Sequence, residues 1–227
     1  MIASVHLADV KATTALSLLR RAPDSGAVQG LRSANIALAT PMRTSFTPKI
    51  SLRRVGLVAF WDDDAALDAF EATHPTANAL SGGFSMRLAP VRAHGSWPGI
   101  DADVPKARRV DYEGPAAVLT LGRVRFSQIV RFLRTSAKAE AATAGARGLR
   151  WATALARPPF VATCSLWEGP DAIAAYAFDD TGAAHPAAIR AGRSQPFHHA
   201  EAFIRFRPIA TAGRLDGTNP LREGIMS

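Results

Sequence analysis

The sequence has 227 residues, of which 48% are hydrophobic, so it is not an intrinsically disordered chain and allows either one large domain or two small ones. The formal net charge is +8, but the basic residues are spread along the chain without a Lys/Arg block, which argues against a nucleic-acid-binding surface. Cys164 is the only cysteine, which excludes an internal disulfide framework, and the lack of a secretory signal or a long uncharged apolar run predicts a cytoplasmic protein.

Strand and helix patterns alternate through the first half of the chain. In chain order they predict a strand over Ile2–Ala8, a helix over Val10–Arg21, strands over Leu31–Ala39 and Arg54–Trp61, a helix over Ala65–Thr73 and a strand over Phe84–His94. Pro23 ends the first helix, and Asp62-Asp63-Asp64 supply an N-cap and negative charge for the second. The stretch Thr40–Leu52 predicts a long loop.

The second half repeats this order. It predicts a strand over Ala116–Leu121, a helix over Phe126–Glu140, strands over Gly148–Ala156 and Phe160–Trp167, a helix over Pro170–Phe178 and a closing strand over Glu201–Arg207. We therefore expect an N-terminal unit over residues 1–100, a linker over 101–114 and a C-terminal unit over 115–210. The polar tail, 211–227, is expected to be loose or docked as an arm.

The sequence itself also repeats. VHLADVKATTALSLLR from Val5 matches LTLGRVRFSQIVRFLR from Leu119, GLRSANIALATP from Gly30 matches GLRWATALARPP from Gly148, and VGLVAFWD from Val55 matches VATCSLWE from Val161. Each half then carries a His-Pro pair, at His74 and His185. These matches predict an internal duplication.

The predicted fold follows from the order of elements. Strand–helix–strand–strand–helix–strand is the ferredoxin-like (βαββαβ) unit, whose antiparallel sheet is covered by helices on one face only. We therefore expect an α+β protein with two tandem ferredoxin-like repeats. Their sheets are expected to pack face to face, as in a dimeric α/β-barrel-type pseudo-dimer, with a ligand cavity between them.

Common catalytic motifs are missing from the sequence. It has no GxGxxG or GxxxxGK[ST] loop, no GxSxG elbow, no HExxH and no paired-cysteine zinc spacing. Cys164 alternates with apolar residues of a predicted strand, so it is expected in the core. The pattern therefore weakens the common hydrolase, kinase and zinc-enzyme interpretations.

The clearest difference between the halves is an insertion after the second His-Pro pair. The stretch AAIRAGRSQPFHH follows His185 and contains Arg190, Arg193 and Phe197. A haem pocket needs an imidazole to ligate iron and arginines to bind propionates. Spacing alone favours the alternative interpretation, an amphipathic surface helix with solvated arginines.

Two further groups of residues could line a ligand site. Arg205 and Arg207 alternate with apolar residues, which indicates either a row facing solvent or an arginine that binds an anion or polarises oxygen. Trp151 stands where the first half has Ser33, so it could line a cavity together with Phe160.

The segments Gly148–Glu168 and His185–Pro208, with the tail element GRLDGTNPL, resemble the spheroidene monooxygenase family of bacterial carotenoid biosynthesis. The resemblance implies a haem-dependent monooxygenase that inserts oxygen into a hydrophobic substrate such as a carotenoid. It implies O₂ and an electron donor, a ferredoxin or a reductase, as partners. At the level of fold, the chain is similar to the haem-containing aldoxime dehydratases, chlorite dismutases and dye-decolorising peroxidases, whose axial histidine lies on a helix of the C-terminal unit.

The resemblance implies roles for named residues. His185 would ligate the iron of haem b, with His198 as the alternative ligand, and His198, His199 or Arg205 would supply a catalytic polar group on the opposite side. The residues expected to contact the cofactor or line the apolar cavity are Arg190, Arg193, Trp151, Phe160 and Phe197. The alternatives are a haem-dependent dehydratase or peroxidase, a cofactor-free oxygenase or small-molecule-binding protein, and a basic scaffold. We expect no nucleic-acid partner; peripheral contact with the inner membrane face and oligomerisation stay open.

Overall fold

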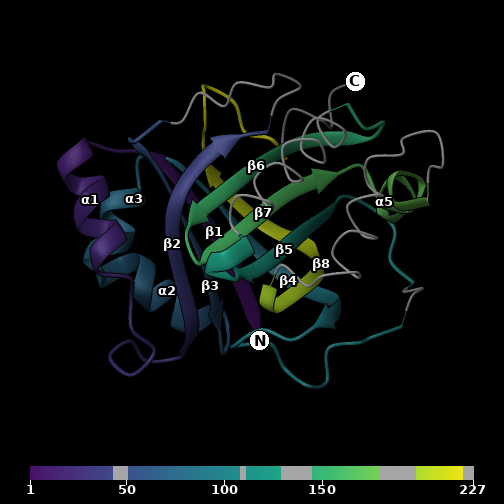
Figure 1. The fold of residues 1–227 in the computed structure, drawn as a ribbon, viewed down its shortest axis with the longest axis horizontal. Helices are drawn as coiled ribbons and strands as arrows, with labels where there is room; N and C mark the ends of the chain where they lie inside the picture. The colour runs from purple at the N-terminus through teal and green to yellow at the C-terminus, as the bar shows by residue number, and fades with distance from the viewer. Residues whose placement is uncertain (43–50, 108–110, 129–144, 179–197, 222–227) are drawn as a thin grey trace.

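The structure is a computed structural model, and it describes residues 1–42, 51–107, 111–128, 145–178 and 198–221. Eight strands form one barrel, with α1, α2 and α3 together on one side and α5 on the opposite side (Figure 1). The strands are β1 (Ile2–Asp9), β2 (Leu31–Pro41), β3 (Arg54–Trp61), β4 (Phe84–Gly95), β5 (Ala116–Val124), β6 (Leu149–Arg157), β7 (Phe160–Trp167) and β8 (His198–Gly213). The helices are α1 (Ala12–Arg20), α2 (Asp64–Thr73), α3 (Pro75–Leu80), the short 3₁₀ helix η1 (Phe126–Gln128) and α5 (Pro170–Phe178).

The strand order of the closed barrel is β1-β3-β2-β6-β7-β5-β8-β4. Each half thus has the order expected of a ferredoxin-like unit, β4-β1-β3-β2 in the first and β8-β5-β7-β6 in the second. The expected barrel-type arrangement of two antiparallel sheets is therefore present, as one closed barrel. Antiparallel pairing of β2 with β6 and of β4 with β8 joins the sheets at both edges, so the strand edges that two separate sheets would expose are hydrogen-bonded.

Most predicted elements are present with shifted ends. Asp63 caps α2 by accepting a hydrogen bond from the Ala66 amide at 2.9 Å, as the aspartate run predicts. Residues 129–144, the larger part of the helix predicted over Phe126–Glu140, lie outside the described residues. No helix in the described part of the chain is long and apolar enough to span a bilayer. The unit boundaries near residues 100 and 115 stay a prediction.

The C-terminal segment continues further in the fold than its composition predicts. β8 runs to Gly213, and the following residues dock on the barrel end, where Leu215 is buried. Arg54 holds this segment: its guanidinium donates to both carboxylate oxygens of Asp216, at 2.9 and 2.6 Å, and to both of Asp9, at 3.0 and 2.7 Å. Of the two options for the tail, the docked arm is therefore the one seen for residues up to 221.

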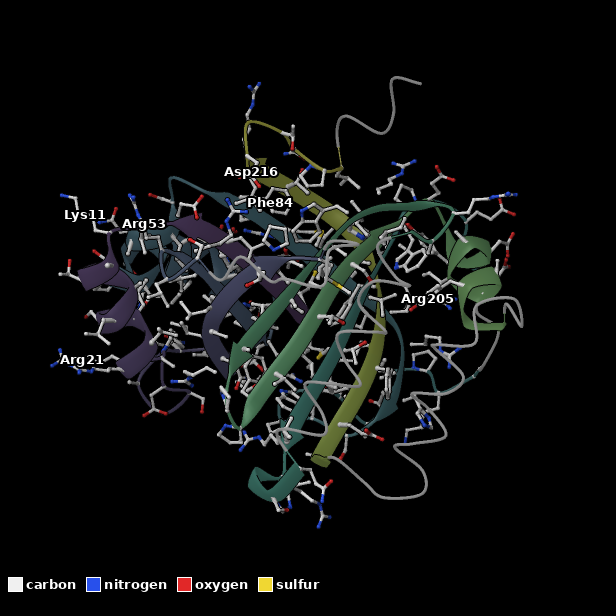
Figure 2. The ribbon with its side chains drawn as sticks, turned by 45° about the horizontal axis from the view of Figure 1, so that its top comes forward. Lys11, Arg21, Arg53, Phe84, Arg205 and Asp216 are labelled. Carbon is white, nitrogen blue, oxygen red and sulfur yellow. The ribbon has the colours of Figure 1, made fainter. Side chains whose placement is uncertain are left out.

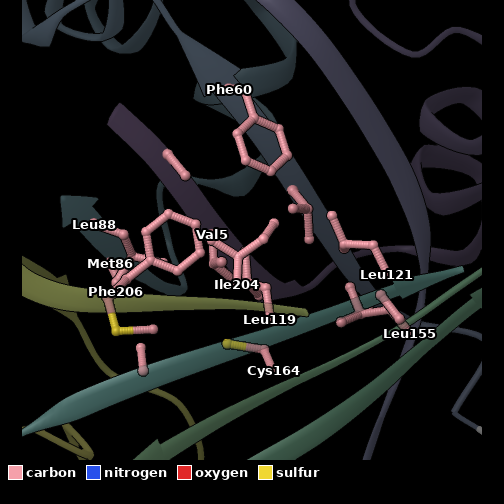
Figure 3. Close-up of a cluster of buried hydrophobic side chains, with 14 of the residues drawn as sticks. Val5, Phe60, Met86, Leu88, Leu119, Leu121, Leu155, Cys164, Ile204 and Phe206 are labelled. Atoms are coloured by element: carbon pink, nitrogen blue, oxygen red, sulfur yellow. The ribbon is translucent and has the colours of Figure 1, made fainter. Parts of the chain in front are cut away.

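The barrel interior is lined by apolar side chains that pack together, as far as the structure describes it. Alternating positions of all eight strands point inward and pack as one apolar cluster (Figure 3). Cys164 belongs to it, as predicted, and burial raises the pKa of its thiol to about 12. The ligand cavity expected between the two sheets stays a prediction.

A second apolar cluster lies between the first half of the barrel and α1, α2 and α3. Trp61 on β3 packs against Phe70 of α2 with ring centroids 4.8 Å apart, and its Nε1 donates to Ser4 Oγ at 2.9 Å. In the second half, Trp167 packs in the same way against Tyr176 of α5, at 5.2 Å. The outward faces of the two halves are thus built on a shared plan.

His6 is buried beneath α2 and lowers stability at acidic pH. Burial, and to a lesser degree the charge of Arg87, lowers its pKa to about 4. Glu71 Oε1 lies 3.9 Å from Nε2, but the other carboxylate oxygen of Glu71 accepts from Arg87 at 2.8 Å, so we give burial the greater weight. The folded state therefore binds this proton less readily than the unfolded state, in which the pKa is about 6.5.

The expected result is a loss of stability as pH falls from about 6.5 to about 4, with no further contribution of His6 below that. It amounts to about 3 kcal/mol at most, because each pKa unit corresponds to about 1.4 kcal/mol. Urea unfolding of the wild type and of His6→Gln at pH 7 and pH 4.5 measures it. The variant should lose less stability between these pH values than the wild type or the exposed-site control His94→Gln; equal losses in all three would contradict the assignment.

Candidate functional site

The candidate site is the outward face of the sheet in the second half of the barrel. We define this outer face by Val118 and Thr120 on β5, Thr163 on β7, and Phe203 and Arg205 on β8. These positions alternate with core residues, and the register places Val118 opposite Arg205, and Thr120 opposite both Thr163 and Phe203. Their side chains are only partly covered, and Phe203 is 43% exposed.

The corresponding face of the first half is sealed. The sequence repeat places Ser4, His6 and Leu57 at the positions of Val118, Thr120 and Thr163, and all three are buried. A face with the same strand order is therefore closed by packing in one half, whereas its counterpart is only partly covered at the residues that the structure describes.

Arg87 on β4 is the first-half counterpart of Arg205. It lies opposite Ser4 in the β1–β4 ladder, as Arg205 lies opposite Val118 in the β5–β8 ladder. Three carboxylates of α2 neutralise Arg87. Its Nη1 donates to Asp64 at 3.1 Å, and its Nη2 donates to Asp68 and to Glu71, each at 2.8 Å.

Arg205 has no such partners. Helix α5 occupies the place of α2, but the positions of the three carboxylates are taken by Pro170, Ala174 and Ala177. No ion pair of Arg205 occurs among the described residues, and the residue paired with it across β4 is another arginine, Arg92. Burial, and then the charge of Arg92, lowers the pKa of Arg205, which still remains a cation at neutral pH.

A partly buried guanidinium without a carboxylate is an electrostatic cost to the folded protein, because it has lost water contacts without gaining a counter-charge. A bound group that brings negative charge or a polarisable oxygen offsets this cost. The outer face can therefore orient such a group through Arg205 and contact an apolar molecule through Val118 and Phe203. Figure 2 labels Arg205 on the side of the barrel away from α1.

The other predicted site residues are not gathered at this face. Trp151 and Phe160 point into the barrel and lie at opposite ends of the β6–β7 hairpin, where they pack on Phe84 and Trp97, in each case with ring centroids 5.9 Å apart. One small ligand cannot touch both. His199 is exposed on β8.

The remaining predicted residues lie outside the part that the structure describes. These are His185, Arg190, Arg193 and Phe197, together with the side chain of His198. Among the described residues, no three His, Cys, Asp or Glu side chains gather as a metal-ligand set. The role of His185 as an iron ligand stays a prediction from the resemblance.

The sequence carried a signal for Arg205 beyond strand alternation. Aligning α2 with α5 from the shared tryptophans, Trp61 and Trp167, shows that the carboxylates of one helix are absent from the other. What it could not show without the structure is that all three carboxylates converge on one arginine.

Comparisons with known proteins identify the family of the chain. A spheroidene monooxygenase of Rubrivivax gelatinosus is 34% identical over 185 residues, which cover 78% of this chain and 68% of that protein. A spheroidene monooxygenase of Cereibacter sphaeroides is 26% identical over 187 residues, and the match covers 79% of this chain and 57% of that protein. No family model matches the chain.

Among solved structures, an aldoxime dehydratase in complex with butyraldoxime matches 97% of this chain and 84% of its own, with a TM-score of 0.56. At 9% identity this likeness shows a shared fold only. The identity and coverage of the Rubrivivax protein decide the relationship: the chain belongs to the spheroidene monooxygenase family, a family of oxidoreductases.

Proposed function

We propose that this protein is a haem-dependent monooxygenase that inserts oxygen into a hydrophobic substrate of the carotenoid class. The observation that carries the proposal is Arg205, which forms no ion pair among the described residues and lies beside Val118 and Phe203 on the outer face, in a chain of the spheroidene monooxygenase family. O₂ and an electron donor, a ferredoxin or a reductase, are the further partners. Peripheral contact with the inner membrane face, where such a substrate dissolves, belongs to the same proposal.

Among the described residues, the outer face supports haem binding better than the barrel interior does. The interior is lined by the apolar cluster. A pocket at one barrel end has a volume of about 290 Å³, just below the range of about 300–1,000 Å³ typical of ligand pockets. The outer face offers apolar contact for a flat ring and, within the part that the structure describes, a cation without an ion pair for an anionic or polar group. The iron ligand would be His185, with Arg190 and Arg193 for the propionates.

Haem, when bound, supplies the one-electron and O₂ chemistry of the reaction. The protein contributes position and polarity. Arg205 donates hydrogen bonds to a polar oxygen at the reacting centre, and the hydroxyls of Thr120 and Thr163 provide further donors on the same face. Val118 and Phe203 exclude water and hold the hydrocarbon.

An absorption spectrum after expression with haem supplied tests the proposal. The purified protein should show a Soret band with about one haem per chain, and oxygenation of an acyclic carotenoid should require both O₂ and reductant. Turnover without reductant would indicate a dehydratase instead, because dehydration needs no net electrons, and turnover with hydrogen peroxide alone a peroxidase. A colourless protein that takes up no hemin would overturn the haem proposal.

A further inference from the structure

The barrel end that holds the docked C-terminal segment contains a pocket separate from the outer face. It has a volume of about 290 Å³. Its lining is formed by Pro41, Met42, Arg54, Leu149, Arg150, Trp151, Ala152, Thr153, Leu215 and Asp216. Phe84, on which Trp151 packs, and Asp216 are labelled at this end in Figure 2. The pocket is partly open and its lining is mixed, with apolar side chains beside polar ones, among which Arg150 forms no ion pair within the described residues.

Arg150 lies at a strand irregularity that both halves share. The register shifts between Leu149 and Trp151 on β6, and between Leu31 and Ser33 on β2, so that Arg150 and Arg32 occupy equivalent positions after the Gly-Leu pairs. The glycine before each has positive φ, 78° at Gly148 and 73° at Gly30. The two arginines are therefore held by the same local backbone.

Their electrostatic surroundings differ. Arg32 donates to Asp62 at 2.6 Å and also to Asp101, so its charge is neutralised. Arg150 forms no ion pair among the described residues, although Glu168 stands at the position of Asp62. Its Nη1 is buried and has no hydrogen-bond acceptor. Leaving a buried donor unsatisfied is unfavourable, so the position calls for an acceptor from outside the barrel.

The other polar groups of the lining do not supply that acceptor. Asp216 is committed to Arg54, which binds both of its carboxylate oxygens and both of those of Asp9. The hydroxyl of Thr153 donates to the Thr40 carbonyl at 3.0 Å. Arg150 is therefore the charged group of this lining that has no counter-charge within hydrogen-bond distance among the residues that the structure describes.

We propose that this pocket binds a small carboxylate with an apolar body. The carboxylate would pair with Arg150, and the body would lie against Trp151, Leu149 and Leu215. The pocket is too small for a long polyene, so its ligand is distinct from the substrate of the outer face and acts as a separate effector or co-substrate. This inference does not depend on haem.

Calorimetric titration of the haem-free full chain with benzoate, and with its neutral isostere benzamide, tests the proposal. Benzoate should bind at least tenfold more tightly than benzamide. Arg150→Gln should remove that preference and leave benzamide binding unchanged. The matched control Arg32→Gln, at the equivalent position of the other barrel end, should keep the preference for benzoate over benzamide. Melting temperatures, measured first, show that each variant is folded.

The location of binding has its own readout. Of the four tryptophan indole signals in a ¹H–¹⁵N spectrum, benzoate should shift that of Trp151, assigned by its loss in Trp151→Phe. The proposal would be overturned if the wild-type protein bound benzoate no better than benzamide. It would also be overturned if Arg150→Gln bound benzoate as tightly as the wild type.

Discussion

Replacing Arg205 with leucine is expected to lower kcat by on the order of 10²–10³-fold, the usual cost of removing one preorganised donor at a centre where charge develops. Leucine keeps the volume and apolar contacts of the side-chain stem, so the fold should persist. Turnover of an acyclic carotenoid under reducing conditions measures the effect. The kcat of Arg205→Lys should lie between those of the wild type and Arg205→Leu, because lysine keeps the charge but not the planar fork of donors.

The first half of the barrel supplies a sharper version of the same experiment. Ala174 occupies the position of Asp68, whose carboxylate accepts from Arg87 at 2.8 Å. Ala174→Asp should therefore pair with Arg205 and remove it from the reaction while the arginine itself stays in place. The expected result is a loss of turnover similar to that of Arg205→Leu, with a free energy of unfolding equal to or above that of the wild type.

The control is Ala175→Asp on the same helix. Its first-half counterpart, Ala69, is exposed and bears no charge, and Ala175 is exposed as well. The control makes the same change in net charge without reaching Arg205, so it should retain wild-type turnover. If Ala174→Asp were as active as the control although stably folded, Arg205 would have no part in the reaction.

Local sequence signals determined most of the strands and α2, and they did so for physical reasons that act over a few residues. Alternation in Val5–Leu7 or Phe160–Leu166 reports one buried face, and Asp63 caps a helix by a bond to a residue only three positions away. Pairing of β2 with β6 and of β4 with β8 is not encoded in any such period. It follows from the meeting of two sheet edges whose residues are far apart in the chain.

The interior of the barrel illustrates a second limit. Trp151 and Phe160 were candidates for a ligand cavity because large aromatic residues line such cavities as well as cores. Which of the two they do depends on how far neighbouring side chains fill the space. Phe160 packs on Trp97, whereas Trp151 packs on Phe84 and also lines the pocket at the barrel end. The contrast between Arg87 and Arg205 likewise became visible only when helix and strand were brought together in space.

His74 and His185 form the other instructive pair, because the repeat gives them the same place before a proline. The structure accounts for His74 completely by its helix-boundary role. Its Nδ1 accepts from the Thr76 amide at 3.1 Å, its own amide donates to the Phe70 carbonyl at 2.9 Å, and its ring stacks on Phe70 at 4.7 Å. His185 is followed instead by the Arg- and His-containing insertion, to which the predicted haem site was assigned.

His185→Ala is therefore expected to abolish the Soret band, because a neutral imidazole would be lost from the iron. His74→Ala should retain the band and lose only about 1 kcal/mol of stability, the typical contribution of a helix cap. His198→Ala tests the alternative ligand, and it should retain the band if His185 binds the iron. Loss of the band in His198→Ala alone would move the assignment to His198. Imidazole added to His185→Gly should restore the band if the side chain acts as a ligand, whereas a structural role of His185 predicts no rescue.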